Sequence, residues 1–228
     1  MKHLLLLAMS VSCLLLDCVL ADESKTFTRE NLREIQFDPD DSTYMRSVET
    51  KYDLGSAILQ QCLAQIIQEE MAGWEIQGVT ILVKANGARG VLWAIGQLEN
   101  STTRTRSNLL TVLRFSQFRE YIDLCIELMS DKSMVPLPRG REPLAIGQRQ
   151  DRICDKARSS ALYILRESKV LPAAMGRQCQ YRAEDDYEVR DSKNGAFRAW
   201  WTSESASNQD IRKAFPSIVN KLLSPSTD

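Results

Sequence analysis

The chain has 228 residues, of which 43% are apolar and 26% are charged, and its formal net charge is −1. This composition is ordinary for a folded globular protein, and the balanced charge excludes a general attraction to nucleic acid or to anionic membranes. The chain contains one histidine, His3, which excludes metal and catalytic sites built on several imidazole groups.

Residues 1–21 predict a secretory signal peptide. Lys2 supplies a positive start, Leu4–Leu16 form an apolar run, and small residues precede a cleavage position after Ala21. The apolar run is too short to span a bilayer, so we expect a secreted, extracellular protein without a stable membrane span. Cleavage removes His3, and a mature chain without histidine excludes Ser-His-Asp and Cys-His catalysis.

Residues 22–42 predict a polar N-terminal arm that precedes one helical domain at residues 43–228. The arm ends in an acidic turn, Asp38-Pro39-Asp40-Asp41-Ser42. Acidic clusters can bind calcium, but the EF-hand spacing with its central glycine and terminal glutamate is absent here. We therefore interpret the turn as a solvated loop that also caps the following helix, and we expect no metal site.

The first strong helical pattern lies at Ile58–Met71. Apolar residues recur there at three- and four-residue spacing, with glutamines and a glutamate between them. Such a stripe buries one face of a helix against its neighbours. Cys62 lies within the stripe and should therefore face the core.

The segment Gly78–Leu98 permits two structures. A β-hairpin would place Asn86-Gly87, a strong hairpin signal, between two short apolar strands. A helical structure would be apolar on nearly all sides and hence buried. We favour one or two buried helices, because an isolated two-stranded ribbon is only marginally stable. Lys84 and Arg89 argue against a membrane span in either case.

Asn100-Ser101-Thr102 is the one N-glycosylation sequon of the chain. It follows the apolar segment within a polar stretch, where a glycan is sterically tolerated. We therefore expect Asn100 to carry a glycan in the secreted protein.

Two further helices are expected on either side of a proline-rich loop. The first begins near Ser107, a good N-cap residue, and runs to about Met129 with a broad apolar face. Residues 131–148 carry three prolines and two glycines and predict a surface loop. The second helix is expected at Asp151–Lys169.

Basic residues gather around the start of this second helix, namely Arg149, Arg152, Lys156 and Arg158. Asp151 and Asp155 interleave with them. One interpretation is a binding face for phosphate or a heparin-like anion. We favour a solvated helix face with ion pairs along it, because alternating charges are typical of exposed helices.

The C-terminal region combines aromatic residues with arginines and ends in a helix at Asp210–Leu223. Pro216 must kink this helix or begin a new turn. Trp200, Trp201 and Arg198 are candidate binding residues, since tryptophan and arginine are enriched at interface hot spots. We favour the alternative that these tryptophans are structural, with one packed beneath the last helix and the other half exposed.

Four cysteines remain after cleavage, namely Cys62, Cys125, Cys154 and Cys179. An even number of cysteines in a secreted chain predicts two disulfides. Three pairings are open, and proximity in sequence favours Cys154–Cys179 with Cys62–Cys125. The cysteine spacing fits no zinc site, so we expect these residues to staple the fold.

Glu69-Glu70 and Glu184-Asp185-Asp186 are the candidate acid/base groups of a histidine-free enzyme. The two carboxyl groups of a glycosidase must lie about 5–10 Å apart across a cleft. Adjacent acids on a helix point apart, so the sequence predicts no catalytic residues.

The sequence thus predicts a mainly α-helical, single-domain multi-helix bundle stapled by two disulfides, with a β-hairpin at Asn86-Gly87 as a variant. We expect it to bind an extracellular protein partner without catalysis and without a cofactor, metal or nucleic acid. The alternative is an extracellular carrier of a lipid or other apolar small ligand, and the third function is the carboxylate-based enzyme. A large apolar cavity would favour the carrier, whereas a filled core with an exposed aromatic patch would favour the protein partner.

Overall fold

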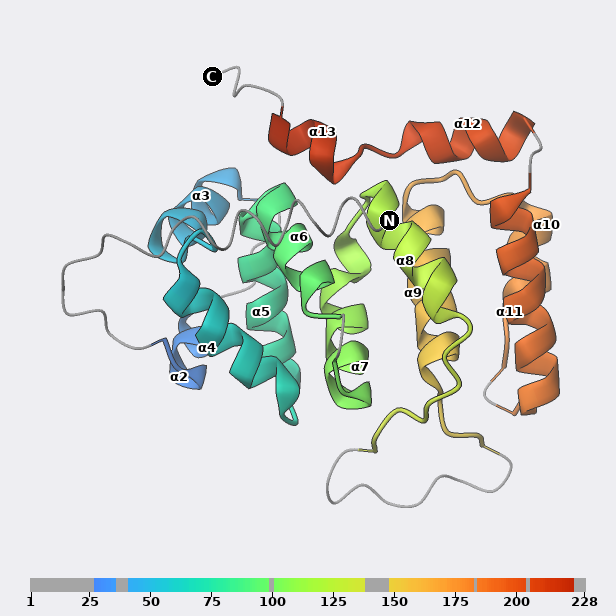
Figure 1. Cartoon of the computed structure of the whole chain (residues 1–228), viewed down its shortest axis with the longest axis horizontal. Helices are drawn as coiled ribbons and strands as arrows, with labels where there is room; N and C mark the ends of the chain where they lie inside the picture. The colour runs from blue at the N-terminus through green and yellow to red at the C-terminus, as the bar shows by residue number, and fades with distance from the viewer. Residues whose placement is uncertain are drawn as a thin grey trace.

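The computed structural model describes residues 27–35, 41–98, 101–137, 148–182, 184–203 and 206–223. Within these ranges the chain is mainly helical and contains no β-strand, which confirms the predicted helical class (Figure 1). One isolated antiparallel bridge joins Met134 to Arg152. Among these residues, every helix is too short or too polar to cross a bilayer.

The helices follow one another along the chain with short connections, apart from the segment between α8 and α9 (Figure 1). The N-terminal half contains α2 (Arg29–Glu34), α3 (Ser42–Lys51), α4 (Ala57–Gln68), α5 (Gly73–Ala85) and α6 (Gly87–Gly96). The C-terminal half contains α7 (Thr103–Val112), the 3-10 helix η1 (Leu113–Phe115), α8 (Arg119–Leu128), α9 (Ile153–Glu167), α10 (Ala173–Cys179), α11 (Tyr187–Thr202), α12 (Ala206–Ala214) and α13 (Ile218–Leu223).

Several predictions fall wholly or partly outside the described ranges, including the acidic turn at residues 38–42 and the surface loop at residues 131–148. The signal peptide at residues 1–21 and the glycosylation site at Asn100 lie entirely outside them. The described part of the expected polar arm contains α2, which packs against α5. Leu32 of α2 is buried in the core, so this part of the arm belongs to the folded body.

Side chains cap several helix starts. Asp41 accepts hydrogen bonds from the backbone N–H groups of Thr43 and Tyr44 at the start of α3, which confirms that the acidic turn caps the next helix. Ser56 and Thr102 cap α4 and α7 in the same way. Each cap satisfies a backbone N–H group that has no partner within its own helix.

The segment Gly78–Leu98 is helical, so the alternative β-hairpin is wrong. It forms most of α5 and all of α6, which pack against each other. Asn86 occupies the corner between them, where its buried side chain accepts from the N–H of Leu54 and donates to the carbonyl oxygen of Leu82. Gly87 follows with a φ of 54°, a left-handed conformation that glycine adopts without strain. The Asn-Gly pair therefore turns one helix into the next.

Two predicted helices are each divided in the structure. The helix expected near residues 107–129 consists of α7, η1 and α8. The last predicted helix consists of α12 and α13 with Pro216 between them, so the proline begins a new turn. The carboxylate of Glu120 on α8 accepts from the N–H of Ile218 and thereby caps α13. Apolar residues continue across both breaks, so the apolar periodicity of the sequence did not reveal where each helix ends.

The helices surround a hydrophobic core that draws on both halves of the chain. α5 packs against α2, α3, α6 and α7, while α9 packs against α7, α8 and α11. α7 therefore joins the two groups, and Figure 1 shows it between α5 and α9. α12 and α13 run along one side of the molecule, and α13 packs against α6. The last described helix is thus tied to the N-terminal half of the chain.

The four cysteines are free, so the predicted pairs Cys62–Cys125 and Cys154–Cys179 are not formed. The first pair is separated by the fold. Cys62 lies on α4, which packs on α7, whereas Cys125 lies on α8, which packs on α9. Sequence spacing could not reveal that α7 comes between these helices (Figure 1).

In the second predicted pair, the thiols of Cys154 and Cys179 each contact a different residue. The Cys154 thiol lies 3.7 Å from a carboxylate oxygen of Asp155, and the Cys179 sulfur lies 3.1 Å from the sulfur of Met175. Burial raises the pKa of Cys125 to about 12 and that of Cys154 to about 11. Protonated, buried thiols are poor nucleophiles, so these cysteines act as small core residues.

Candidate functional site

An open cleft of about 790 Å³ runs along the adjoining sides of α7 and α9. Its other walls come from α5, from η1, and from the segments 135–137 and 148–151. Six basic and two acidic side chains line it, namely Arg104, Arg114, Arg149, Lys156, Arg166, Arg190, Glu70 and Asp151. We call this site the basic cleft.

Lys156 of α9 lines the basic cleft and is only partly exposed. Its Nζ atom donates a hydrogen bond to the Oγ atom of Ser107 on α7, at an N–O distance of 2.7 Å. Burial lowers the pKa of Lys156 to about 8, an effect that the Asp151 carboxylate opposes and the Arg114 guanidinium increases. No carboxylate of a described residue lies within ion-pairing distance of Lys156. The ammonium group is therefore desolvated and bonded to a neutral partner.

Other cations occupy the neighbouring walls. The guanidinium of Arg114 lies 4.7 Å from the ring centroid of Tyr163, a cation–π contact. Arg104 approaches the carboxylate of Glu70 at 3.8 Å. Arg166 is exposed. The basic cleft therefore presents a positive surface on a chain whose net charge is close to zero.

The rim of the basic cleft carries exposed apolar side chains. Leu137 is 39% exposed and Tyr163 is 42% exposed, and both line the cleft. Met134 is 45% exposed and lies three residues before Leu137. Two of the seven exposed large apolar side chains in the described part of the chain thus line this site, and Met134 lies near one of them in sequence.

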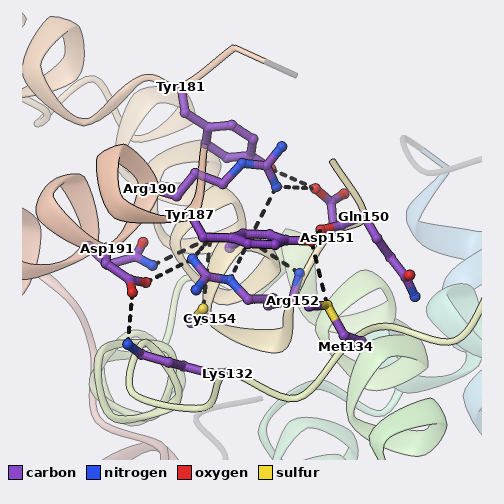
Figure 2. A network of polar contacts seen from close by, with 12 residues as sticks. Lys132, Met134, Gln150, Asp151, Arg152, Cys154, Tyr181, Tyr187, Arg190 and Asp191 are labelled. Carbon is purple, nitrogen blue, oxygen red and sulfur yellow. Dashed lines mark hydrogen bonds and ion pairs between the residues drawn. The ribbon is translucent and has the colours of Figure 1, made fainter. Parts of the chain in front are cut away.

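Three arginines alternate with two tyrosines in a stack at one wall of the cleft. The distances from guanidinium carbon to ring centroid are 4.1 Å for Arg158–Tyr181, 4.6 Å for Arg190–Tyr181, 5.8 Å for Arg190–Tyr187 and 4.5 Å for Arg152–Tyr187. Figure 2 shows this alternation from Tyr181 down to Arg152. Tyr181 and Arg190 both line the cleft. We call this group the Arg–Tyr stack.

Acidic side chains neutralise much of the Arg–Tyr stack. Asp155 is fully buried and pairs with Arg152 and Arg190 at 3.2 Å each. Arg152 also pairs with Asp191 at 2.8 Å, and Asp151 pairs with Arg190 at 3.1 Å. Burial alone would raise the pKa of Asp155, but the hydrogen bonds and charge of Arg152, together with the hydrogen bond from Arg190, hold the pKa below its ordinary value. The charged carboxylate therefore fixes two arginines in place.

Unlike the other two arginines of the Arg–Tyr stack, Arg158 forms no ion pair with a described residue. It is fully buried, and its Nη1 atom donates to the backbone carbonyl of Arg190 at 3.2 Å. Its Nε and Nη2 atoms have no hydrogen-bond partner among the described residues. Burial lowers the pKa of Arg158, and the nearby Tyr181 and Asp155 oppose this shift. The cation–π contact with Tyr181 and the hydrogen bond to the Arg190 carbonyl both stabilise this buried charge.

The structure revises the interpretation of the basic residues near the start of α9. Arg152 and Arg158 are buried, whereas a solvated face was expected. Arg149 is exposed, and Lys156 faces the basic cleft. The interleaved Asp155 does form ion pairs, as predicted, but within the core. Sequence reasoning missed the burial because the stacking tyrosines come from segments beyond α9.

The residues predicted for a C-terminal binding site form no exposed aromatic patch. Trp201 is buried, and its Nε1 atom donates a hydrogen bond to Asp123 at 2.8 Å. Trp200 is partly buried against Phe197 and Trp201. Arg198 is exposed. This geometry agrees with the packing interpretation, and a binding role for these residues stays a prediction.

Acids from both predicted carboxylate groups have structural partners. Glu69 pairs with Arg29 at 2.8 Å, and Asp185 pairs with Lys193 at 2.7 Å. Asp186 caps α11. In the described ranges, no cluster of three histidine, cysteine, aspartate or glutamate side chains could hold a metal ion.

The basic cleft combines an open shape, cations such as Lys156 and Arg114 that form no ion pair with a described residue, apolar rim residues and the ordered Arg–Tyr stack. Such a surface can recognise an extended ligand that carries both negative and apolar groups. No family model matches the chain, and comparison with curated proteins and with solved structures gives no match either. The function of the cleft therefore has to follow from its own chemistry.

Proposed function

We propose that this chain is a secreted, non-catalytic binding protein that holds a segment of an extracellular protein partner in the basic cleft. The main support is the occurrence of cations and exposed apolar side chains in one open cleft. Secretion is inferred from the signal-peptide pattern of residues 1–21.

The dimensions and composition of the basic cleft suit a peptide segment. Its volume of about 790 Å³ falls within the range of about 300–1,000 Å³ that is common for ligand sites. Arginine and tyrosine are enriched at binding hot spots, and Arg114 with Tyr163 offers such a pair at the cleft surface. The Arg–Tyr stack is already ordered by ion pairs, so binding there costs little side-chain entropy.

The alternative functions have less support. A carrier of apolar ligands needs a pocket lined mainly by apolar side chains. Neither the basic cleft nor the smaller hollow beside it, which is lined by Gln68, Glu69, Glu70 and Arg104, has such a lining. For the carboxylate-based enzyme, three of the candidate acids are engaged in ion pairs or a helix cap.

Photo-crosslinking from the rim tests the proposal. A benzoylphenylalanine residue replaces Leu137 in one variant and Ile58 in another. Ile58 lies on α4, is 52% exposed and does not line the cleft, so it is the control for an exposed apolar position. In extracellular fluid of the source organism, we expect the Leu137 probe to form an adduct that protease digestion removes, and the Ile58 probe to form none.

Two results would contradict this function. Equal adducts at both positions, or no adduct from Leu137, would remove the basic cleft as the site of partner binding. A protease-resistant adduct that mass spectrometry identifies as a lipid would favour the carrier instead.

A further inference from the structure

We propose that Lys156, Arg114 and Ser107 form an oxyanion subsite within the basic cleft, which holds a carboxylate or phosphate group of the bound segment. This inference rests on the proposed function and adds the chemical class that the cleft selects. We call the three residues the oxyanion subsite.

Three packed elements bring the subsite together. Lys156 comes from α9, Ser107 from α7 and Arg114 from η1, and each of these elements packs against the other two. The hydrogen bond of 2.7 Å between Lys156 and Ser107 joins α9 to α7 directly. Lys156 and Arg114 both line the basic cleft, so one ligand in the cleft can meet both cations.

Within the described part of the chain, the two cations of the oxyanion subsite have no acidic partner, unlike Arg190 and Arg104. Neither Lys156 nor Arg114 forms an ion pair with a described residue. Arg190, by comparison, pairs with two aspartates, and Arg104 approaches Glu70. Like charges that are partly removed from water repel each other and are stabilised by an anion. Asp151, which also lines the cleft, partly offsets this repulsion without forming an ion pair with Lys156. A bound oxyanion would contact both cations directly and relieve what remains of the repulsion.

The hydrogen-bond donors of the subsite also fit an oxyanion. The Lys156 ammonium group has three N–H donors and uses one on Ser107. The Ser107 hydroxyl accepts this bond and retains its own proton as a donor. The Arg114 guanidinium donates to no described residue and can offer two parallel N–H groups. Charge-assisted bonds of this kind are the strongest that carboxylates and phosphates receive from side chains.

Calorimetric titration of the full secreted chain tests the subsite with two probes at low salt. One probe is a hexaglutamate peptide, and the other is a peptide of the same length that contains phosphoserine. Lys156→Met removes the ammonium group, and Arg114→Met removes the guanidinium. Lys84→Met is the matched control, because Lys84 is exposed on α5 and does not line the cleft.

We expect the Kd for at least one peptide to rise by about tenfold or more in Lys156→Met and in Arg114→Met, since a hydrogen bond to a charged group is lost in each. The control should change it by less than about twofold. A response confined to hexaglutamate identifies a carboxylate ligand, and one confined to the phosphoserine peptide identifies a phosphate ligand. Either result supports the subsite.

Three results would overturn the subsite: an unchanged Kd in Lys156→Met, an equal loss in Lys84→Met, or no binding of either peptide by the wild-type chain. Thermal unfolding of each variant checks the fold. Removal of a desolvated ammonium group should not lower the unfolding temperature, so lost binding by Lys156→Met cannot be assigned to unfolding.

Failure of the subsite can be told apart from failure of the proposed function. If the Leu137 probe captures a protein equally well with and without Lys156→Met, the function stands and the subsite does not. If that probe captures no protein while peptide binding depends on Lys156, the subsite stands and the proposed protein partner does not.

Discussion

Lys156 is a residue that lowers the stability of the unliganded protein. Its pKa of about 8 in the folded chain lies below the ordinary value of 10.5. Between these values the unfolded chain binds more protons than the folded chain, so the free energy of unfolding rises as the pH increases through this interval. Below about pH 8 the folded protein carries the full cost of a partly buried ammonium group.

Replacing Lys156 with methionine should therefore stabilise the protein near pH 7 by about 1–2 kcal/mol, after allowance for the solvent that still reaches the side chain. Urea unfolding measures this difference, which should shrink near pH 10 because the wild-type lysine is then largely neutral. Lys84→Met should change the stability little at either pH, since Lys84 is exposed. Equal stabilities of Lys156→Met and the wild type near pH 7 would mean that the ammonium group is fully solvated.

Asp155 has the opposite effect, because its charge compensates buried cations. Its pKa lies below the ordinary value of 3.8, so its contribution to stability is present above that value and is lost as the pH falls below it. Asp155→Asn leaves Arg152 and Arg190 without their shared partner and should cost about 3–5 kcal/mol in urea unfolding. Asp53→Asn is the control, since the pair between Asp53 and Arg89 is more than half exposed. It should cost less than about 1 kcal/mol. Similar losses in both variants would place Asp155 in a solvated pair.

Among the helices, α4 and α9 lie close to their predicted spans because a regular apolar stripe defines each of them. The breaks at η1 and at Pro216 differ from the prediction, since apolar residues continue on both sides.

The basic cleft was not predictable at the scale of single helices. Lys156, Ser107 and Arg114 belong to three elements, and periodicity shows which face of a helix is apolar but not which helix it meets.

The contact between α5 and α6 gives a prediction at the scale of elements. A Cβ atom at Gly90 would lie 2.2 Å from the backbone carbonyl oxygen of Val83, so Gly90→Ala must push α6 away from α5. We expect a loss of about 1–3 kcal/mol in thermal or urea unfolding. Gly96→Ala, at the end of α6, meets no atom within 4 Å and should be neutral or stabilise by up to about 1 kcal/mol. Equal stabilities of the two variants would indicate that these helices pack less closely.

Across the whole molecule, charge is unevenly distributed. The net charge of the chain is −1, yet among the described residues six basic and two acidic side chains line the basic cleft. The overall charge therefore excluded a general attraction of the chain to polyanions, but it carries no information about a local cluster of cations. The cleft forms where α7 joins the two halves of the core, so its cations come from segments far apart in sequence. The basic residues noted near the start of α9 supply Arg149 and Lys156, but the other four cations of the cleft lie outside that group.

Because cations gather in the basic cleft, we expect salt to weaken capture of the protein partner. Raising the ionic strength from about 0.1 M to about 1 M shortens the Debye length from about 10 Å to about 3 Å, which screens exposed cations such as Arg166. Crosslinking from Leu137 should therefore fall severalfold over this range, and Lys156→Met should lose part of the dependence. The apolar rim acts in the opposite direction, since salt does not weaken burial of apolar surface. Capture that holds or increases at high salt would assign recognition to Leu137 and Tyr163 rather than to the cations.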